Sequence, residues 1–250
     1  MKSNARFDLS SAGLHILAMA FMLLDHLWAT VVPGNEWLTC VGRLAFPIFA
    51  FLVAEGFCHT RNLKKYMLRL LLWAVISEIP FNLMFSGRIF YPLHQNVLWT
   101  FLLSLGLMAW VERAQNAPLW RKFLRWVCAF CVGMILGTLT MVDYYGYGVA
   151  MVLVFYLCRK NWWQLKPWLN RLIQLFGLYW INVEMMGGLV YEFPLFGGTV
   201  VIHQQGFALL ALIPIWLYRG RQGLHSPAFR YFCYGFYPAH MLLLALLQLL

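Results

Sequence analysis

An apolar stretch at residues 14–32 carries two ionisable side chains next to each other, Asp25 and His26. The stretch is long enough to cross the hydrocarbon core of a bilayer as a helix, at about 1.5 Å of rise per residue. Ionisable groups inside such a segment are costly, and they usually face a protein interior or a water-filled cavity. The stretch therefore predicts a membrane helix with a polar functional site inside the bilayer.

The composition of the whole chain is typical of a membrane protein. Of 250 residues, 62% are hydrophobic and only 11% are charged, whereas about a quarter of the residues in soluble domains are charged. No polar stretch is long enough to bury a core of its own. We therefore expect residues 1–250 to form a single transmembrane helical domain, and the fold class to be an all-α polytopic membrane protein.

Apolar runs predict about nine transmembrane helices, within a range of eight to ten because three runs are short for a full crossing. The runs cover residues 14–32, 39–57, 67–85, 97–111, 126–142, 146–158, 172–190, 207–218 and 229–248. Short connections join them, so the sequence predicts one compact helical bundle.

The basic residues indicate how this bundle is oriented. With the N-terminus in the cytoplasm, all 19 Lys and Arg residues except Arg43 and Arg88 fall on the cytoplasmic side, Lys2 and Arg6 among them. This positive-inside pattern explains the net charge of +10 as a consequence of membrane orientation. We therefore expect the lipid bilayer as a partner and no nucleic acid, although the basic face could also attract anionic lipid or a polyanionic cofactor.

Arg43 breaks the positive-inside pattern near the external end of its segment. Antiparallel packing would bring it to a depth similar to that of Asp25 and His26, which favours a shared polar site over an isolated surface arginine. Pro47 can free a backbone carbonyl and open a kink in the same segment. Other polar residues fall at compatible depths, and they are Glu78, Asn96, Thr100, Asp143, Glu184 and His240.

Histidine suits proton transfer near neutral pH. Adjacent helical residues point about 100° apart, so we expect one of Asp25 and His26 to face a cavity while the other pairs with a neighbouring helix. His26 is the first candidate for a base or nucleophile, and His240 is the second. His94 and His203 lie in external loops, where a substrate could touch them.

Several common catalytic and nucleotide-binding motifs are absent from the sequence. It contains no P-loop, G-x-G-x-x-G, H-E-x-x-H or G-x-S-x-G motif, so ATPase, dinucleotide, zincin and serine-hydrolase chemistry have no support. The C-x-x-C at Cys128 and Cys131 lies in an apolar run with no second pair and no nearby His. We interpret these cysteines as packing residues and expect no metal.

Short motifs along most of the chain resemble those of TraX-like membrane proteins. They occur in the family's order and are Ala-Met-Ala-Phe-Met-Leu-Leu-Asp-His at 18–26, Gly-Arg-Leu-Ala-Phe-Pro-Ile-Phe-Ala at 42–50, Asn-Val-Leu at 96–98, Tyr-Gly-Tyr-Gly at 145–148 and Phe-Tyr-Pro-Ala-His at 236–240. The resemblance implies a multi-pass acetyltransferase of the bacterial cytoplasmic (inner) membrane. Its name-giving members acetylate the N-terminal amine of conjugative pilin, and the family looks related to broader transmembrane acyltransferases that use cytoplasmic acetyl-CoA and a buried His.

The resemblance leads to expected roles for the polar residues. We expect His26, assisted by Asp25 and Asn96, to deprotonate an amine or hydroxyl acceptor or to become acetylated transiently. Asn96 or Arg43 would stabilise the thioester oxygen, and basic loops would hold the phosphates of acetyl-CoA. The residues expected to bind substrate or acetyl-CoA are Arg43, Glu78, Thr100, Asp143 and His240. The acceptor stays open between a pilin-like N-terminus, a glycan and a small molecule, and homo-oligomer formation stays open too.

Two other functions are compatible with the same polar residues. Buried carboxylates, His and a Pro kink are equally natural in a secondary transporter or channel, which predicts substrate flux in liposomes without covalent change. A non-catalytic scaffold would use them only to hold helices together. The resemblance and the lack of a clear internal repeat favour the acyltransferase.

Overall fold

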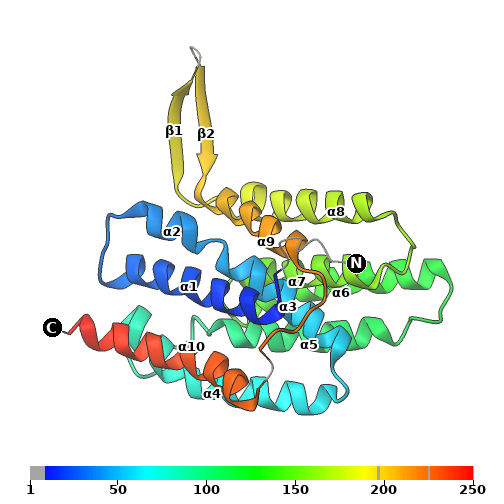
Figure 1. The fold of residues 1–250 in the computed structure, drawn as a ribbon, viewed down its shortest axis with the longest axis horizontal. Helices are drawn as coiled ribbons and strands as arrows, with labels where there is room; N and C mark the ends of the chain where they lie inside the picture. Colours follow the sequence, from blue (N-terminus) through cyan, green and yellow to red (C-terminus); the bar gives the residue numbers. More distant parts are fainter. Residues whose placement is uncertain (1–8, 196–197, 225, 250) are drawn as a thin grey trace, which may run out of the picture.

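The computed structural model describes residues 9–195, 198–224 and 226–249, so Lys2 and Arg6 lie outside the described residues. Most of the described chain is helical (Figure 1). The helices are α1 (Ser11–Thr30), α2 (Glu36–Gly42), α3 (Ala45–His59), α4 (Leu63–Ser86), α5 (Val97–Glu112), α6 (Leu119–Leu139), α7 (Tyr145–Lys160), α8 (Pro167–Tyr179), the π-helix η1 (Trp180–Met186), the 3-10 helix η2 (Gln204–Ala211), α9 (Leu212–Leu217) and α10 (Pro227–Leu247).

Every predicted segment coincides with helical structure. In chain order the nine segments correspond to α1, α2 with α3, α4, α5, α6, α7, α8 with η1, η2 with α9, and α10. Four helical stretches are long and apolar enough to cross a membrane, and they are Ser11–Thr30, Glu36–His59, Leu63–Ser86 and Leu119–Leu139. The helical membrane-protein character is therefore supported, while nine crossings stay a prediction.

Polar residues at the edges of the apolar runs determine where several helices begin. The side chains of Ser10, Asn62, Asn96 and Ser226 each accept a hydrogen bond from a backbone amide in the first turn of the helix that follows. Such caps satisfy amides that have no partner inside the helix. At its other end α4 stops at Gly87, whose φ of 65° is left-handed and favours glycine.

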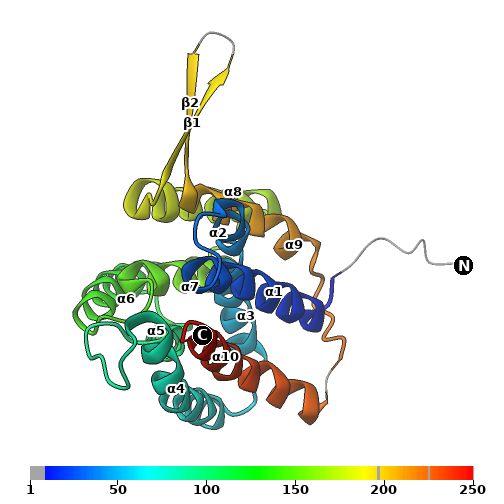
Figure 2. The same cartoon turned by 90° about the vertical axis from the view of Figure 1, so that its left-hand side faces the viewer.

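Helix α7 lies at the centre of the bundle. Its residues 148–156 are all buried, and it packs against α3, α5, α6 and α8. Helix α10 packs against both α4 and α1, and Figure 2 shows it beside these two helices. This packing brings the last helix of the chain against the first, which places residues far apart in sequence around one interior.

The second predicted segment is broken between α2 and α3. Arg43 and Leu44 separate the two helices, and Pro47 lies in the first turn of α3. A proline ring clashes with the carbonyl four residues earlier, here that of Arg43, so a continuous helix is disfavoured at this place. The kink expected from Pro47 is confirmed as this break.

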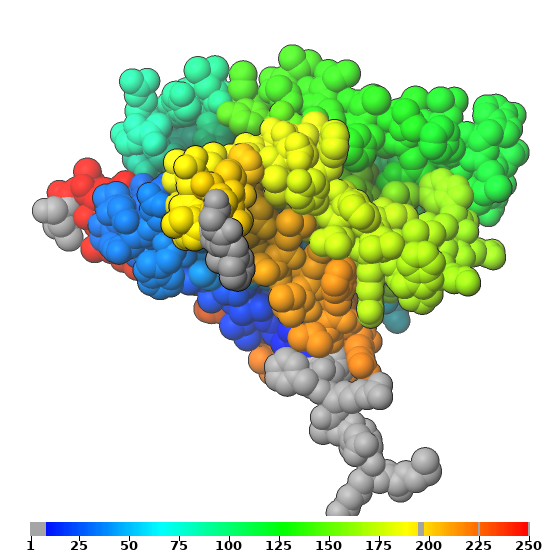
Figure 3. Space-filling view, turned by 90° about the horizontal axis from the view of Figure 1, so that it is seen from above, coloured from blue at the N-terminus to red at the C-terminus, as the bar shows by residue number. Residues whose placement is uncertain are grey.

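The expectation of an all-α chain is wrong at residues 190–203. The sequence places His203 in an external loop there, but the segment forms strands β1 (Val190–Leu195) and β2 (Gly198–His203), paired antiparallel with Val190 opposite His203. The segment is rich in Val, Ile, Phe and Tyr, which favour strands. The hairpin projects from the helices in Figure 1, and Figure 3 shows it standing over α2 and η2–α9.

Candidate functional site

Asp25 and Arg43 form an ion pair inside the bundle. The Arg43 guanidinium donates to Asp25 Oδ2, and the Thr39 hydroxyl donates to Asp25 Oδ1 at 2.7 Å. Gln204 extends the network, because its amide donates to Thr39 Oγ1 at 2.9 Å. A Cβ atom at Gly42 would lie 2.7 Å from Asp25 Oδ1, so glycine allows α2 to approach α1 this closely. The predicted meeting of Asp25 and Arg43 is confirmed.

His26 and His240 form a second pair beside this network. His26 Nδ1 lies 2.7 Å from His240 Nε2, and the two rings are stacked with an interplanar angle of 10°. His240 Nδ1 lies 2.7 Å from the Phe236 carbonyl. Because a carbonyl only accepts, His240 carries its proton on Nδ1, and its Nε2 accepts from His26 Nδ1 when both rings are neutral.

The hydrogen-bond order in this pair leaves one nitrogen available for chemistry. With its proton on Nδ1, His26 has an unprotonated Nε2, and the described part of the chain supplies no partner for that atom. Two aromatic rings pack against the pair. Phe85 meets His26 edge-on with 5.6 Å between ring centroids, and Phe236 stacks on His240 with 4.8 Å between ring centroids. The arrangement orients His26 as a base or nucleophile through His240.

Asp25 does not orient His26. Its carboxylate bonds to Arg43 and Thr39, whereas the His26 ring bonds to His240. The expectation that one of the two residues faces a cavity while the other pairs with a neighbouring helix is met only for the pairing, because both residues pair with other helices and neither belongs to the lining of the cavity described below. Within the described residues Arg43 Nε is buried and has no hydrogen-bond partner, and Arg43 lies close enough to His26 for their charges to interact. Arg43 thus keeps a spare donor near the histidine pair.

Glu78 and Asn96 form a third cluster. Asn96 Nδ2 donates to Glu78 Oε2 at 2.5 Å and to the Ala74 carbonyl at 2.9 Å, while its Oδ1 caps α5 at Leu98. Trp99 Nε1 also donates to Glu78 Oε2, at 3.0 Å. Both polar atoms of the Asn96 side chain are therefore engaged. Glu78 Oε1, in contrast, is buried without a partner among the described residues.

Asp143 contacts both His94 and Thr100, at the same end of the bundle as the Glu78–Asn96 cluster. His94 Nε2 lies 3.3 Å from Asp143 Oδ1, and the Thr100 hydroxyl donates to the Asp143 carbonyl at 2.6 Å. The hydrogen bond to Asp143 raises the pKa of His94 above its usual value. Phe85 touches the rings of both His94 and His26, so this cluster adjoins the histidine pair.

All eight predicted site residues therefore lie in these adjoining clusters, but two other candidates do not. Glu184 is exposed and accepts from the Tyr179 hydroxyl. His203 ends β2, near Gly187. Thr39, Gln204 and Trp99 were missed by the sequence analysis.

A cavity of about 530 Å³ runs through the bundle between α1, α3, α4, α5 and α10. Its mouth lies among the N-terminal ends of α1, α4 and α10, the ends predicted to face the cytoplasm. Polar and charged side chains line this part, among them Ser11, His15, Glu55, His59, Tyr66, Arg69, Arg230 and Tyr234. Farther in, the lining is apolar and includes Met19, Met22, Leu98 and Phe101.

The cavity points at the histidine pair. On α1 the lining residues His15, Met19 and Met22 follow helical spacing, and His26 is the next residue of that series. On α10 the series of Arg230, Tyr234 and Tyr237 leads in the same way to His240. The cavity therefore ends about one helical turn short of both histidines.

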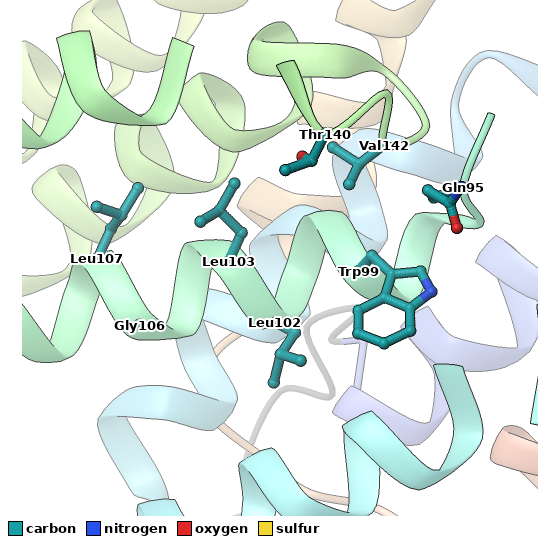
Figure 4. Close-up of a pocket in the computed structure, with 8 residues that line it drawn as sticks. All are labelled: Gln95, Trp99, Leu102, Leu103, Gly106, Leu107, Thr140 and Val142. Carbon is teal, nitrogen blue, oxygen red and sulfur yellow. The ribbon is translucent and has the colours of Figure 1, made fainter. Parts of the chain in front are cut away.

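A second hollow of about 510 Å³ lies along α5, beside the turn that follows α6 (Figure 4). It is lined by Trp99, Leu102, Leu103, Gly106 and Leu107 with Thr140 and Val142, and Gln95 lies at one end. None of these lining residues is charged, so this hollow offers no acid, base or cation for catalysis.

An ionic network borders the mouth of the large cavity, and Glu55 and His59 belong to both the network and the cavity lining. Glu55 is buried and accepts from Arg159 Nε at 2.5 Å, with His59 Nε2 at 2.9 Å. Lys160 donates to Glu112 at 2.7 Å, and the Tyr156 hydroxyl bonds to the same carboxylate. These contacts connect α3, α5 and α7 at the end opposite the histidine pair.

Comparison with known proteins agrees with the motifs in this site. The family model described as TraX protein matches residues 10–248. The chain belongs to the TraX family. A relative from Dichelobacter nodosus, named probable fimbrial assembly protein FimC, is 27% identical over 96% of both chains. Protein TraX of Escherichia coli is 26% identical over 56% of this chain and 52% of its own length. No solved structure is significantly similar to the chain.

Proposed function

We propose that this protein is a membrane-embedded acyltransferase that moves an acetyl group from cytoplasmic acetyl-CoA to an amine or hydroxyl acceptor. In this proposal the nine helical segments cross the bacterial inner membrane with the N-terminus in the cytoplasm. The observation that carries the proposal is the histidine pair about one helical turn beyond the inner end of a cavity that has Arg69 and Arg230 near its mouth. An oriented neutral imidazole next to a deep cavity suits acyl transfer better than passage of a solute.

The cavity fits an acyl-CoA donor by polarity. Arg69 and Arg230 lie near the mouth, where cationic side chains suit phosphate groups. The apolar interior suits the uncharged arm that ends in the thioester. A donor bound in this direction would carry its acetyl group toward His26 and His240.

The reaction then follows ordinary acyl-transfer chemistry. His26 Nε2 takes the proton from the acceptor nitrogen or oxygen, and that atom forms a bond to the thioester carbonyl carbon. The carbon–sulfur bond breaks as the tetrahedral intermediate collapses, and the CoA thiolate takes the proton from His26. His240 stabilises the charged imidazolium through Nε2. Arg43, with its free Nε–H, is a better candidate than the fully engaged Asn96 for stabilising the oxyanion.

The remaining polar residues would hold this arrangement and receive the acceptor. Asp25 keeps Arg43 in place, so its role is positioning. Glu78 and Asp143 provide negative charge on the acceptor side, which would attract an amine acceptor that arrives protonated. Such an amine releases one proton to solvent before it reacts, and His26 takes the second proton as the new bond forms. The fimbrial assembly name of the Dichelobacter relative supports a pilin-like polypeptide as acceptor.

A thiol-release assay tests this function. The purified protein in nanodiscs, given acetyl-CoA and a peptide with a free N-terminal amine, should release CoA thiol and acetylate the peptide. His26→Ala should reduce release at least 100-fold, the usual size of a lost general base, and His203→Ala is the matched control that should not. If the wild-type protein binds no acetyl-CoA and instead moves a solute across liposomes, the transporter hypothesis replaces the acyltransferase.

A further inference from the structure

Tyr237 lies at the inner end of the cavity. It belongs to the cavity lining and is only 6% exposed. Its ring centroid lies 6.0 Å from that of His240, which is one turn farther along α10. Its phenol group contacts the Val97 backbone at the start of α5. The side chain thus reaches across from α10 to α5 at the inner end of the cavity.

Met22 and Val97 complete this end. Both line the cavity, and Met22 precedes His26 by one helical turn on α1. Three side chains from three helices, Met22, Val97 and Tyr237, therefore form an end wall on the histidine side. Among them the tyrosine ring is the largest, so it contributes most to closing the cavity.

The polarity of the cavity determines which part of a donor meets this wall. The basic residues lie at the mouth, and the inner lining is apolar. An acyl-CoA with its phosphates at the mouth must direct its acyl group inward. The space in front of Tyr237 then decides how long that acyl group can be.

We propose that Tyr237 is a specificity-determining residue that restricts the donor to short acyl groups, a proposal that rests on the acyltransferase function above. In this proposal the thioester carbonyl lies between Tyr237 and Met22, facing His26 and the acceptor, while the alkyl end of the acyl group packs against the Tyr237 ring. An acetyl methyl fits in that space, and a butyryl group would have to displace the ring. Tyr237→Ala removes the ring and opens room for additional methylene groups. Each methylene newly buried contributes about fourfold in affinity, so two should change the preference by about 15-fold.

The experiment compares acetyl-CoA and butyryl-CoA in binding and in thiol release, with protein in nanodiscs. The wild-type protein should prefer acetyl-CoA, and Tyr237→Ala should raise the butyryl-to-acetyl ratio of kcat/KM at least 10-fold. Tyr237→Phe keeps the ring and should keep the wild-type ratio. Tyr234→Ala, one turn nearer the mouth, enlarges the side of the cavity and should leave the ratio unchanged as well.

Met22→Ala provides a second route to the same space if Tyr237→Ala does not fold, and it should shift the ratio in the same direction. A folded Tyr237→Ala or Met22→Ala that consumes acetyl-CoA with the wild-type chain-length ratio would overturn the end-wall role and leave the proposed function standing. A wild-type protein that neither binds nor consumes any acyl-CoA would overturn both.

Discussion

The ion pair between Asp25 and Arg43 supports a quantitative prediction about stability. Both side chains are largely shielded from solvent, at 16% and 15% exposure. Replacing Arg43 with Met leaves the Asp25 carboxylate with Thr39 as its remaining hydrogen-bond donor among the described residues. Removing one partner of a buried pair typically costs about 3–5 kcal/mol, because the other charge stays buried without compensation.

This cost converts into a measurable shift in melting temperature. For a chain of this size, 1 kcal/mol corresponds to about 2–4 °C in Tm, so Arg43→Met should lower Tm by about 6–20 °C. The double variant Asp25→Asn with Arg43→Met removes both charges and should recover most of the loss, since neutral replacements of buried pairs are often nearly neutral in stability. Tryptophan fluorescence during heating in detergent would follow the unfolding.

Arg88→Met is the matched control. Arg88 is the other basic residue predicted on the external side, and it is exposed, so its removal should shift Tm by less than about 2 °C. The explanation in terms of an uncompensated buried charge fails if the double variant melts no higher than Arg43→Met. It also fails if Arg43→Met melts like the wild-type protein.

Three further predictions concern residues around the site and at the opposite end. Gly42→Ala would place a Cβ atom 2.7 Å from Asp25 Oδ1, and such overpacking should cost about 1–3 kcal/mol, seen as a Tm lower by about 2–12 °C. Because Asp143 raises the pKa of His94 above 6.5, the protonated ring stabilises the fold fully below pH 6.5 and the contribution is lost as pH rises through the raised pKa. The Tm of the wild-type protein should therefore fall across that window relative to His94→Gln, and parallel curves would contradict the pairing. Glu55→Ala removes an acceptor shared by several donors and should lower Tm by about 2–12 °C, whereas an unchanged Tm would show that the network contributes little.

Much of the fold follows from hydrophobic runs alone. Nine apolar segments predicted nine helical stretches, because an apolar run of this length has few alternatives to a helix in a membrane. The hairpin at 190–203 was not predicted, because the sequence places an external loop there, although residues 190–193 and 199–202 are rich in β-branched and aromatic side chains. The break at Arg43 was foreseen only as a kink at Pro47.

The site was predictable in part for a different reason. The meeting of Asp25 and Arg43 follows from equal depth in adjacent antiparallel helices, which topology supplies. His26 and His240 are 214 positions apart, and only the packing of α10 against α1 brings them together. The cavity and its end wall at Tyr237 depend on how five helices leave space between them, which no periodicity in a single helix reveals.

The acyltransferase proposal depends most directly on the unprotonated Nε2 of His26. The decisive measurement is chemical rescue: CoA thiol release by His26→Ala, with and without added imidazole, beside the wild-type protein. The proposal predicts that the variant is at least 100-fold slower and that imidazole restores part of the rate in a concentration-dependent way. A His26→Ala protein that releases thiol at the wild-type rate without imidazole would contradict the assignment of His26 as the reacting base.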